Sequence, residues 1–63
     1  METRVSVKKR RGQWLVTVDG MTMHRAGSRK VALTEARSLG RDHAPAYVEA
    51  ENRHGAWKTI ATY

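Results

Sequence analysis

The sequence predicts a small α+β domain. An antiparallel sheet of three strands is followed by one helix and then by a C-terminal hairpin, with the helix packed on one face of the sheet. Polar and apolar residues alternate near both ends of the chain, as they do in half-buried strands. Between Ser28 and Pro45 the apolar spacing becomes that of a helix. Because the chain has only 63 residues, positions 1–63 are expected to form a single domain.

Three strands are expected before the helix. Thr3–Lys8 alternates polar and apolar residues, and Gln13–Val18 is rich in β-branched and aromatic residues. Arg10–Gly12 is typical of the turn between them. Asp19–Gly20 predicts a tight hairpin turn of type I′, which requires positive φ, before a shorter third strand over Met21–Arg25.

One helix is expected from about Arg29 to about His43. Ser28 is a candidate N-cap, because its hydroxyl can accept a hydrogen bond from a free N–H of the first turn. Pro45 ends the helix, since proline disfavours helical conformation in the residue before it. The apolar stripe consists largely of small residues, which predicts close packing on the sheet: Ala32, Leu33, Ala36, Leu39, Gly40 and His43.

A C-terminal hairpin is expected after the helix. Ala46–Glu51 alternates again, and Ala56–Thr62 predicts the last strand. Asn52–Gly55 is typical of the turn that joins them, because Gly55 readily takes positive φ.

Composition excludes several classes of protein. The chain has no cysteine, so disulfides, zinc ribbons and thiol nucleophiles are ruled out, and the reducing cytoplasm is the favoured compartment. No apolar run approaches the length of a membrane span, and no signal peptide precedes Thr3–Lys8, so we expect no membrane partner.

The net charge of +6, from 12 Lys and Arg against 6 Asp and Glu, points to an anionic partner. Residues 1–20 and residues 21–43 each carry +3, whereas residues 44–63 are neutral. This distribution predicts one electropositive surface, although a charge that only keeps a small protein soluble would look the same.

Two sets of cations are candidates for contacting phosphates. The run Lys8–Arg11 lies at a strand end and turn, and Lys30, Thr34, Arg37 and Arg41 fall on one side of the helix, within an arc of about 60°. An ordinary solvated surface is the alternative for both sets. The expected nucleic-acid-binding residues are Lys8, Lys9, Arg10, Arg11, Arg25, Arg29, Lys30, Arg37 and Arg41.

The two tryptophans have different expected roles. Trp14 shares its strand face with Val16 and Val18, which favours a place in the core. Trp57 shares its face with Thr59 and Ala61, so both a structural role and stacking on an unpaired base stay open.

Catalysis and metal binding are not expected. The three histidines have no second ligand at metal-like spacing, so neither a metal nor another cofactor is predicted. Glu49 and Glu51 share a strand face, where a solvated edge or an ion pair with Arg53 or Lys58 is expected instead of acid–base chemistry. No nucleophile elbow or phosphate-binding loop occurs, so we expect a protein that is not an enzyme.

The order of motifs resembles the short bacterial and phage proteins of domain-of-unknown-function family 2188, over nearly the whole chain. The resemblance implies a fold and no agreed activity. Its turn at residues 52–55 is one residue longer than expected for the family, and Lys8–Arg11 is more basic. The residues that carry the resemblance are Gly12, Trp14, Val16, Gly20, His24, Arg25, Ala26, Ala32, Leu33, Ala36, Arg37, Leu39, Arg41, Tyr47, Val48, Gly55 and Tyr63.

A weaker similarity is to the arm-site DNA-binding domain of phage-type tyrosine recombinases. A basic segment, Gly12-x-Trp14, three strands and one helix look like that domain, which binds DNA through its sheet. The likeness ends near Leu39, and the hairpin at residues 46–62 departs from it.

These observations favour a nucleic-acid-binding protein, with DNA expected over RNA and double-stranded DNA contacted through phosphates with limited sequence preference. The alternative is a protein-interaction module, such as a phage or bacterial regulator that docks on a host protein by a sheet edge or by the strand of Met21 and Met23. A third possibility is a homodimer whose assembly creates the basic surface.

Overall fold

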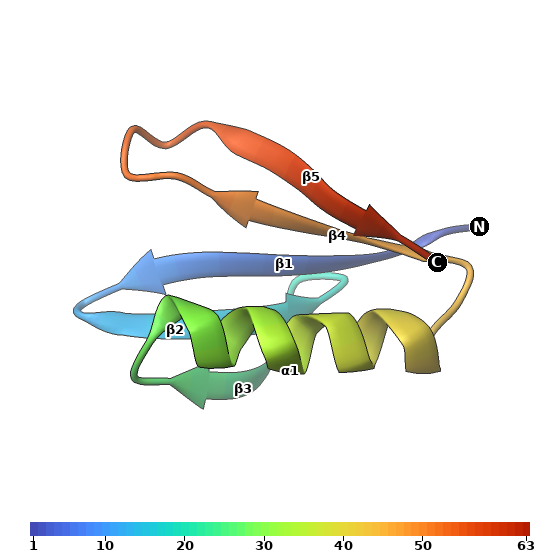
Figure 1. Cartoon of the computed structure of the whole chain (residues 1–63), viewed down its shortest axis with the longest axis horizontal. Helices are drawn as coiled ribbons and strands as arrows, with labels where there is room; N and C mark the ends of the chain where they lie inside the picture. Colours follow the sequence, from blue (N-terminus) through green and yellow to red (C-terminus); the bar gives the residue numbers. More distant parts are fainter.

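The fold is one sheet of five strands with a single helix on one face. The computed structural model describes all residues 1–63, and Figure 1 shows the helix lying along the sheet. The elements are β1 (Thr3–Arg10), β2 (Gln13–Val18), β3 (Met21–Ala26), α1 (Arg29–Asp42), β4 (Ala46–Glu51) and β5 (Trp57–Thr62). The α+β class and the six expected elements are therefore present, with boundaries that differ from those expected by two residues at most.

The expected antiparallel sheet with a separate hairpin is wrong. The strand order is β3-β2-β1-β4-β5, and β4 pairs with β1 in parallel, with Val5 opposite Val48. The sheet is therefore mixed, and the hairpin extends it from three strands to five. Parallel pairing follows from α1, whose 14 residues carry the chain back about 21 Å, to the end of the sheet where β1 begins.

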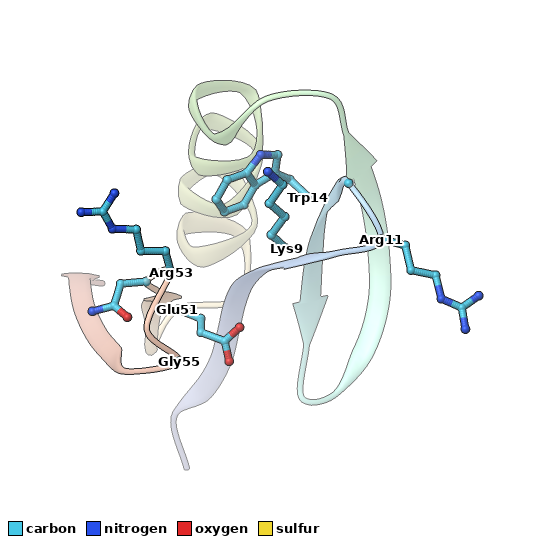
Figure 2. Close-up of a pocket in the computed structure, with 8 residues that line it drawn as sticks. Lys9, Arg11, Trp14, Glu51, Arg53 and Gly55 are labelled. Carbon is cyan, nitrogen blue, oxygen red and sulfur yellow. The ribbon is translucent and has the colours of Figure 1, made fainter.

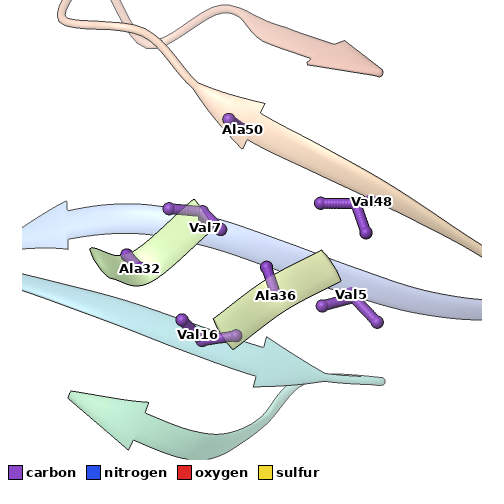
Figure 3. Close-up of a cluster of buried hydrophobic side chains, with 7 residues drawn as sticks. All are labelled: Val5, Val7, Val16, Ala32, Ala36, Val48 and Ala50. Atoms are coloured by element: carbon purple, nitrogen blue, oxygen red, sulfur yellow. The ribbon is translucent and has the colours of Figure 1, made fainter. Parts of the chain in front are cut away.

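The core lies between the helix and the middle strands. Seven buried residues form it, and all are valines or alanines, as Figure 3 shows. Ala32 and Ala36 are fully buried, and their small side chains allow α1 to lie close to the sheet. The seven residues are Val5, Val7, Val16, Ala32, Ala36, Val48 and Ala50.

Both ends of the helix agree with the local signals. The Ser28 hydroxyl accepts a hydrogen bond from the Val31 N–H at 3.3 Å, which confirms the expected N-cap. At the other end, His43 is the C-cap and its N–H donates to the Leu39 carbonyl. His43 is exposed, so it is not part of the apolar stripe.

Gly40 is buried because the C-terminus packs against it. A Cβ at this position would meet two ring carbons of Tyr63 at 2.8 Å and a methyl group of Val48 at 3.1 Å. Tyr63 is held there by two backbone hydrogen bonds with Ala46. The expected reason for this glycine, close packing, is confirmed.

The other face of the sheet has no helix on it. Val5 and Val7 face α1, so Arg4, Ser6, Lys8 and Arg10 of the same strand point to the opposite side. We call this second side the open face. Its charged residues come from β1, β3 and β4, whereas β2 and β5 contribute uncharged residues such as Leu15 and Trp57.

Candidate nucleic-acid interface

Three loops that are distant in sequence lie at one end of the molecule. Arg10 pairs with Gln13, Trp14 with Ala26, and Glu51 with Trp57. The β1–β2 turn, the start of α1 and the β4–β5 turn therefore gather at the same end, on the left of Figure 1. We call it the basic end, and define it as the half of the molecule from the level of Val7 to these loops.

Nine of the 12 Lys and Arg side chains belong to the basic end. Glu35 and Glu51 are its two carboxylates, so its formal charge is about +7, whereas the other half, with three cations and four carboxylates, has about −1. The charge is thus divided along the strand direction, and two cations of the neutral segment 44–63 also belong to the charged half. The nine cations are Lys8, Lys9, Arg10, Arg11, Arg25, Arg29, Lys30, Arg53 and Lys58.

The structure brings together seven of the nine residues expected from the sequence. Arg37 and Arg41 are exposed on α1 as expected, but the helix carries them away from the basic end. Arg53 and Lys58 join the basic end and were missed. Their position depends on the pairing of β4 with β1, which no local sequence pattern predicts.

A groove of about 540 Å³ opens between the β1–β2 turn and the β4–β5 turn. Trp14 and Glu51 are among its lining residues, and Arg53 flanks it from the β4–β5 turn. Figure 2 shows the Lys9 side chain lying across the indole of Trp14, with its ammonium nitrogen 5.8 Å from the ring centroid, while Arg11 points away. Trp14 is half-buried and packs against the core, so its expected structural place is confirmed.

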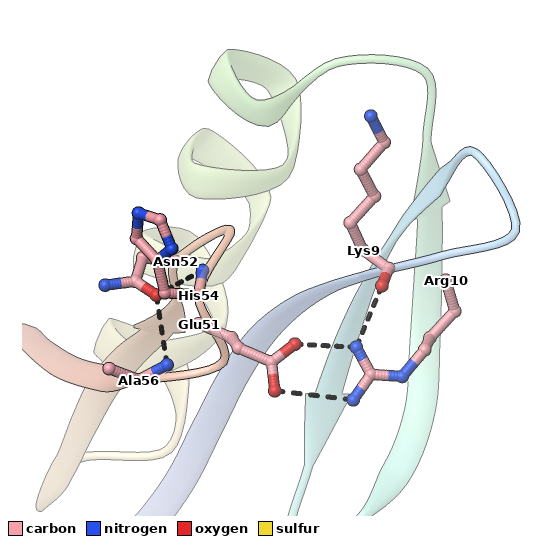
Figure 4. Close-up of polar contacts among 6 residues, drawn as sticks. All are labelled: Lys9, Arg10, Glu51, Asn52, His54 and Ala56. Atoms are coloured by element: carbon pink, nitrogen blue, oxygen red, sulfur yellow. Dashed lines mark hydrogen bonds and ion pairs between the residues drawn. The ribbon is translucent and has the colours of Figure 1, made fainter.

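Glu51 is neutralised by Arg10. The Arg10 guanidinium donates from Nη1 to Oε1 at 2.6 Å and from Nη2 to Oε2 at 3.4 Å, as Figure 4 shows. This hydrogen bonding lowers the pKa of the Glu51 carboxyl group, and the charges of Arg10 and Lys8 lower it further. The expected pairing of this carboxylate with Arg53 or Lys58 is therefore wrong, because the partner comes from β1.

The turn that carries Arg53 is well supported. The Asn52 side-chain oxygen accepts hydrogen bonds from the N–H groups of His54 at 2.8 Å and Ala56 at 3.0 Å. Gly55 has a φ of 81°, as its position in the turn requires. These contacts fix the direction in which Arg53 leaves the turn.

The open face holds a second, smaller hollow of about 280 Å³. Arg4, Lys8 and Trp57 line it. Glu49, which also lines it, accepts a hydrogen bond from the Ser6 hydroxyl at 3.1 Å and lies 3.8 Å from the Arg4 guanidinium. Trp57 is 44% exposed there, so it has little part in the core.

The remaining ionisable groups form no metal-binding cluster. No three His, Asp or Glu side chains lie close enough to hold a metal ion. His24 on β3 lies 3.6 Å from Glu35 on α1, and this isolated contact joins the edge strand to the helix. The single helix is neither long enough nor apolar enough to cross a bilayer.

No family model matches the chain, and neither a curated protein nor a solved structure matches it. The resemblance to domain-of-unknown-function family 2188 and the weaker likeness to recombinase arm-site domains therefore stay predictions.

Proposed function

We propose that this protein binds nucleic acid through phosphate contacts made by the basic end. One observation carries the proposal: nine of the 12 cations, from segments far apart in sequence, gather in one half of the molecule. Such a concentration of charge attracts a polyanion and releases its condensed counterions on binding.

The cations at the loops are free to contact phosphates. Arg11, Arg29, Lys30 and Arg53 are all exposed, and none of them is in an ion pair. The start of α1 adds the positive end of the helix dipole, and no acidic residue occupies its first turn to offset it. A rigid sheet and helix hold these loops, so little conformational entropy is lost when they engage a ligand.

Phosphate contacts position a protein without reading base sequence, so binding should have limited sequence preference. DNA is the ligand we propose, as the sequence favours. Phosphates occur in duplexes and in single strands, and the basic end alone does not select between them.

Two matched pairs of arginines test the location of the interface. Arg11→Ala/Arg53→Ala removes two exposed cations from the basic end, and Arg37→Ala/Arg41→Ala removes two exposed cations from α1 outside it. Affinity for a labelled DNA should fall in the first variant, and its log K against log salt slope should become shallower by about 2. An equal or larger loss in the second variant would move the interface to the helix.

A protein-interaction role is the second candidate, because Met21 and Met23 are 69% and 47% exposed on the edge strand β3. A free strand edge with flexible apolar side chains is suited to pairing with an extended segment of another protein. Such docking would depend little on salt, whereas phosphate binding weakens steeply as salt rises.

A further inference from the structure

The open face presents the indole of Trp57 to solvent, and this side chain is 44% exposed. Trp57 begins β5 and is opposite Glu51, so it lies level with the basic end. Trp14 packs against the core on the side of the sheet that α1 covers, whereas Trp57 is exposed on the open face. An indole left exposed in a protein with so small a core has a surface available for stacking.

The hollow beside Trp57 offers space for a base next to an exposed indole. The Glu49 carboxylate in it lies 3.8 Å from the Arg4 guanidinium and accepts a hydrogen bond from Ser6, so it is not an unpaired negative charge. Bases are uncharged, so this carboxylate does not exclude them. Lys8 and Arg4 also line the hollow, within reach of the backbone beside such a base; Lys8 has no ion pair, and Arg4 lies beside Glu49.

A line of side chains connects this hollow with the rest of the open face. Lys8 is opposite Leu15, and Leu15 is opposite Arg25. Glu51 and Trp57 continue the line across β4 and β5, and four strand spacings make it about 19 Å long. Among the charged residues of this line, Glu51 is paired with Arg10, whereas Lys8 and Arg25 form no ion pair.

We propose that the open face binds a single-stranded nucleic acid, with Trp57 stacking on one unpaired base and with Lys8 and Arg4 contacting the adjacent backbone. The inference rests on the proposed function and adds the form of the ligand. Bases inside a duplex are already stacked on one another, so only a strand with unpaired bases can use Trp57.

The test measures binding of labelled oligonucleotides of about 12 nucleotides at about 50 mM salt. The three ligands are single-stranded DNA, single-stranded RNA and the DNA duplex. Comparing the affinities for the two single strands shows whether the stacked base comes from DNA or from RNA. Trp57→Ala should weaken single-strand binding about 10-fold and leave duplex binding unchanged. Trp57→Phe keeps an aromatic ring and should retain most of the affinity.

Tryptophan fluorescence gives a second readout that does not depend on the alanine variant folding. Single-stranded DNA should quench the emission of the Trp14→Phe protein, in which Trp57 is the remaining indole. The Trp57→Phe protein, which retains Trp14, should show little quenching.

Three results would overturn the inference. Single-strand binding that is unchanged in Trp57→Ala would show that no base stacks on Trp57. If that binding still weakened with rising salt, the proposed phosphate contacts at the basic end would still be supported. A wild-type dimer that Trp57→Ala converts to a monomer would show that a second copy covers the face. If no nucleic acid binds at all, the proposed function fails as well.

Discussion

The guanidinium of Arg10 holds both carboxylate oxygens of Glu51, at 2.6 Å and 3.4 Å, and this contact joins the ends of two parallel strands. The recorded pairing of β1 with β4 stops at Val7 and Ala50, so the ion pair continues the junction beyond it. The same contact places the negative charge of Glu51 at the basic end and occupies one of its arginines.

Acid should weaken the fold through Glu51. Its pKa in the folded protein lies below that of the unfolded chain, so the ionised carboxylate stabilises the native state above about pH 4.5. This stabilisation is lost as pH falls through the folded pKa. Between about pH 6 and about pH 3, the melting temperature of wild type should therefore fall more than that of Glu51→Gln. Equal decreases in melting temperature for the two proteins, measured by circular dichroism, would show that the ion pair contributes nothing to the stability of the fold.

Glu51→Gln should also bind DNA more tightly than wild type at neutral pH. The change removes a negative charge from the basic end and frees Arg10, so the salt slope should become steeper by about 1. Glu2→Gln, near the start of β1 at the opposite end, makes the same change in net charge and is the matched control. If the two variants gain affinity equally, overall charge and not its position governs binding.

Gly40→Ala should destabilise the protein although alanine is the better helix former. The new methyl group would lie 2.8 Å from the Tyr63 ring, and overpacking costs about 1–3 kcal/mol against a helix gain of about 1 kcal/mol. Chemical denaturation measures the balance. The loss should shrink in a Tyr63→Ala background, and a loss of the same size there would mean that Tyr63 is not the obstacle.

Local signals were sufficient to predict the helix, its cap and most strand boundaries. Ser28 and Pro45 act through their nearest neighbours, and Asp19–Gly20 takes the positive φ of its turn at both residues. The order of the strands in the sheet could not be predicted in this way. Ser6 and Glu49 are 43 residues apart and share a hydrogen bond, and alternation alone does not state which strands are neighbours.

The candidate site was only partly predicted, because some of its residues come together through strand pairing and not through sequence proximity. Residues of the run Lys8–Arg11 are adjacent in sequence, so their charge was visible, whereas Arg53 and Lys58 reach the basic end only through the parallel pairing. Trp57 was left open because Thr59 and Ala61 gave no sign of which face of the sheet is uncovered. A break in the ladder between Val48 and Glu49 also shifts the register of β5, which simple alternation does not foresee.

The salt dependence of DNA binding measures how many phosphates the basic end neutralises. If the basic end neutralises about four to six phosphates of a duplex, log K against log salt should fall with a slope of roughly −3.5 to −5.5. The measurement needs only the wild-type chain and a labelled duplex titrated at several salt concentrations. A slope near zero, or no binding at about 50 mM salt, would show that the basic end does not bind the phosphates of DNA.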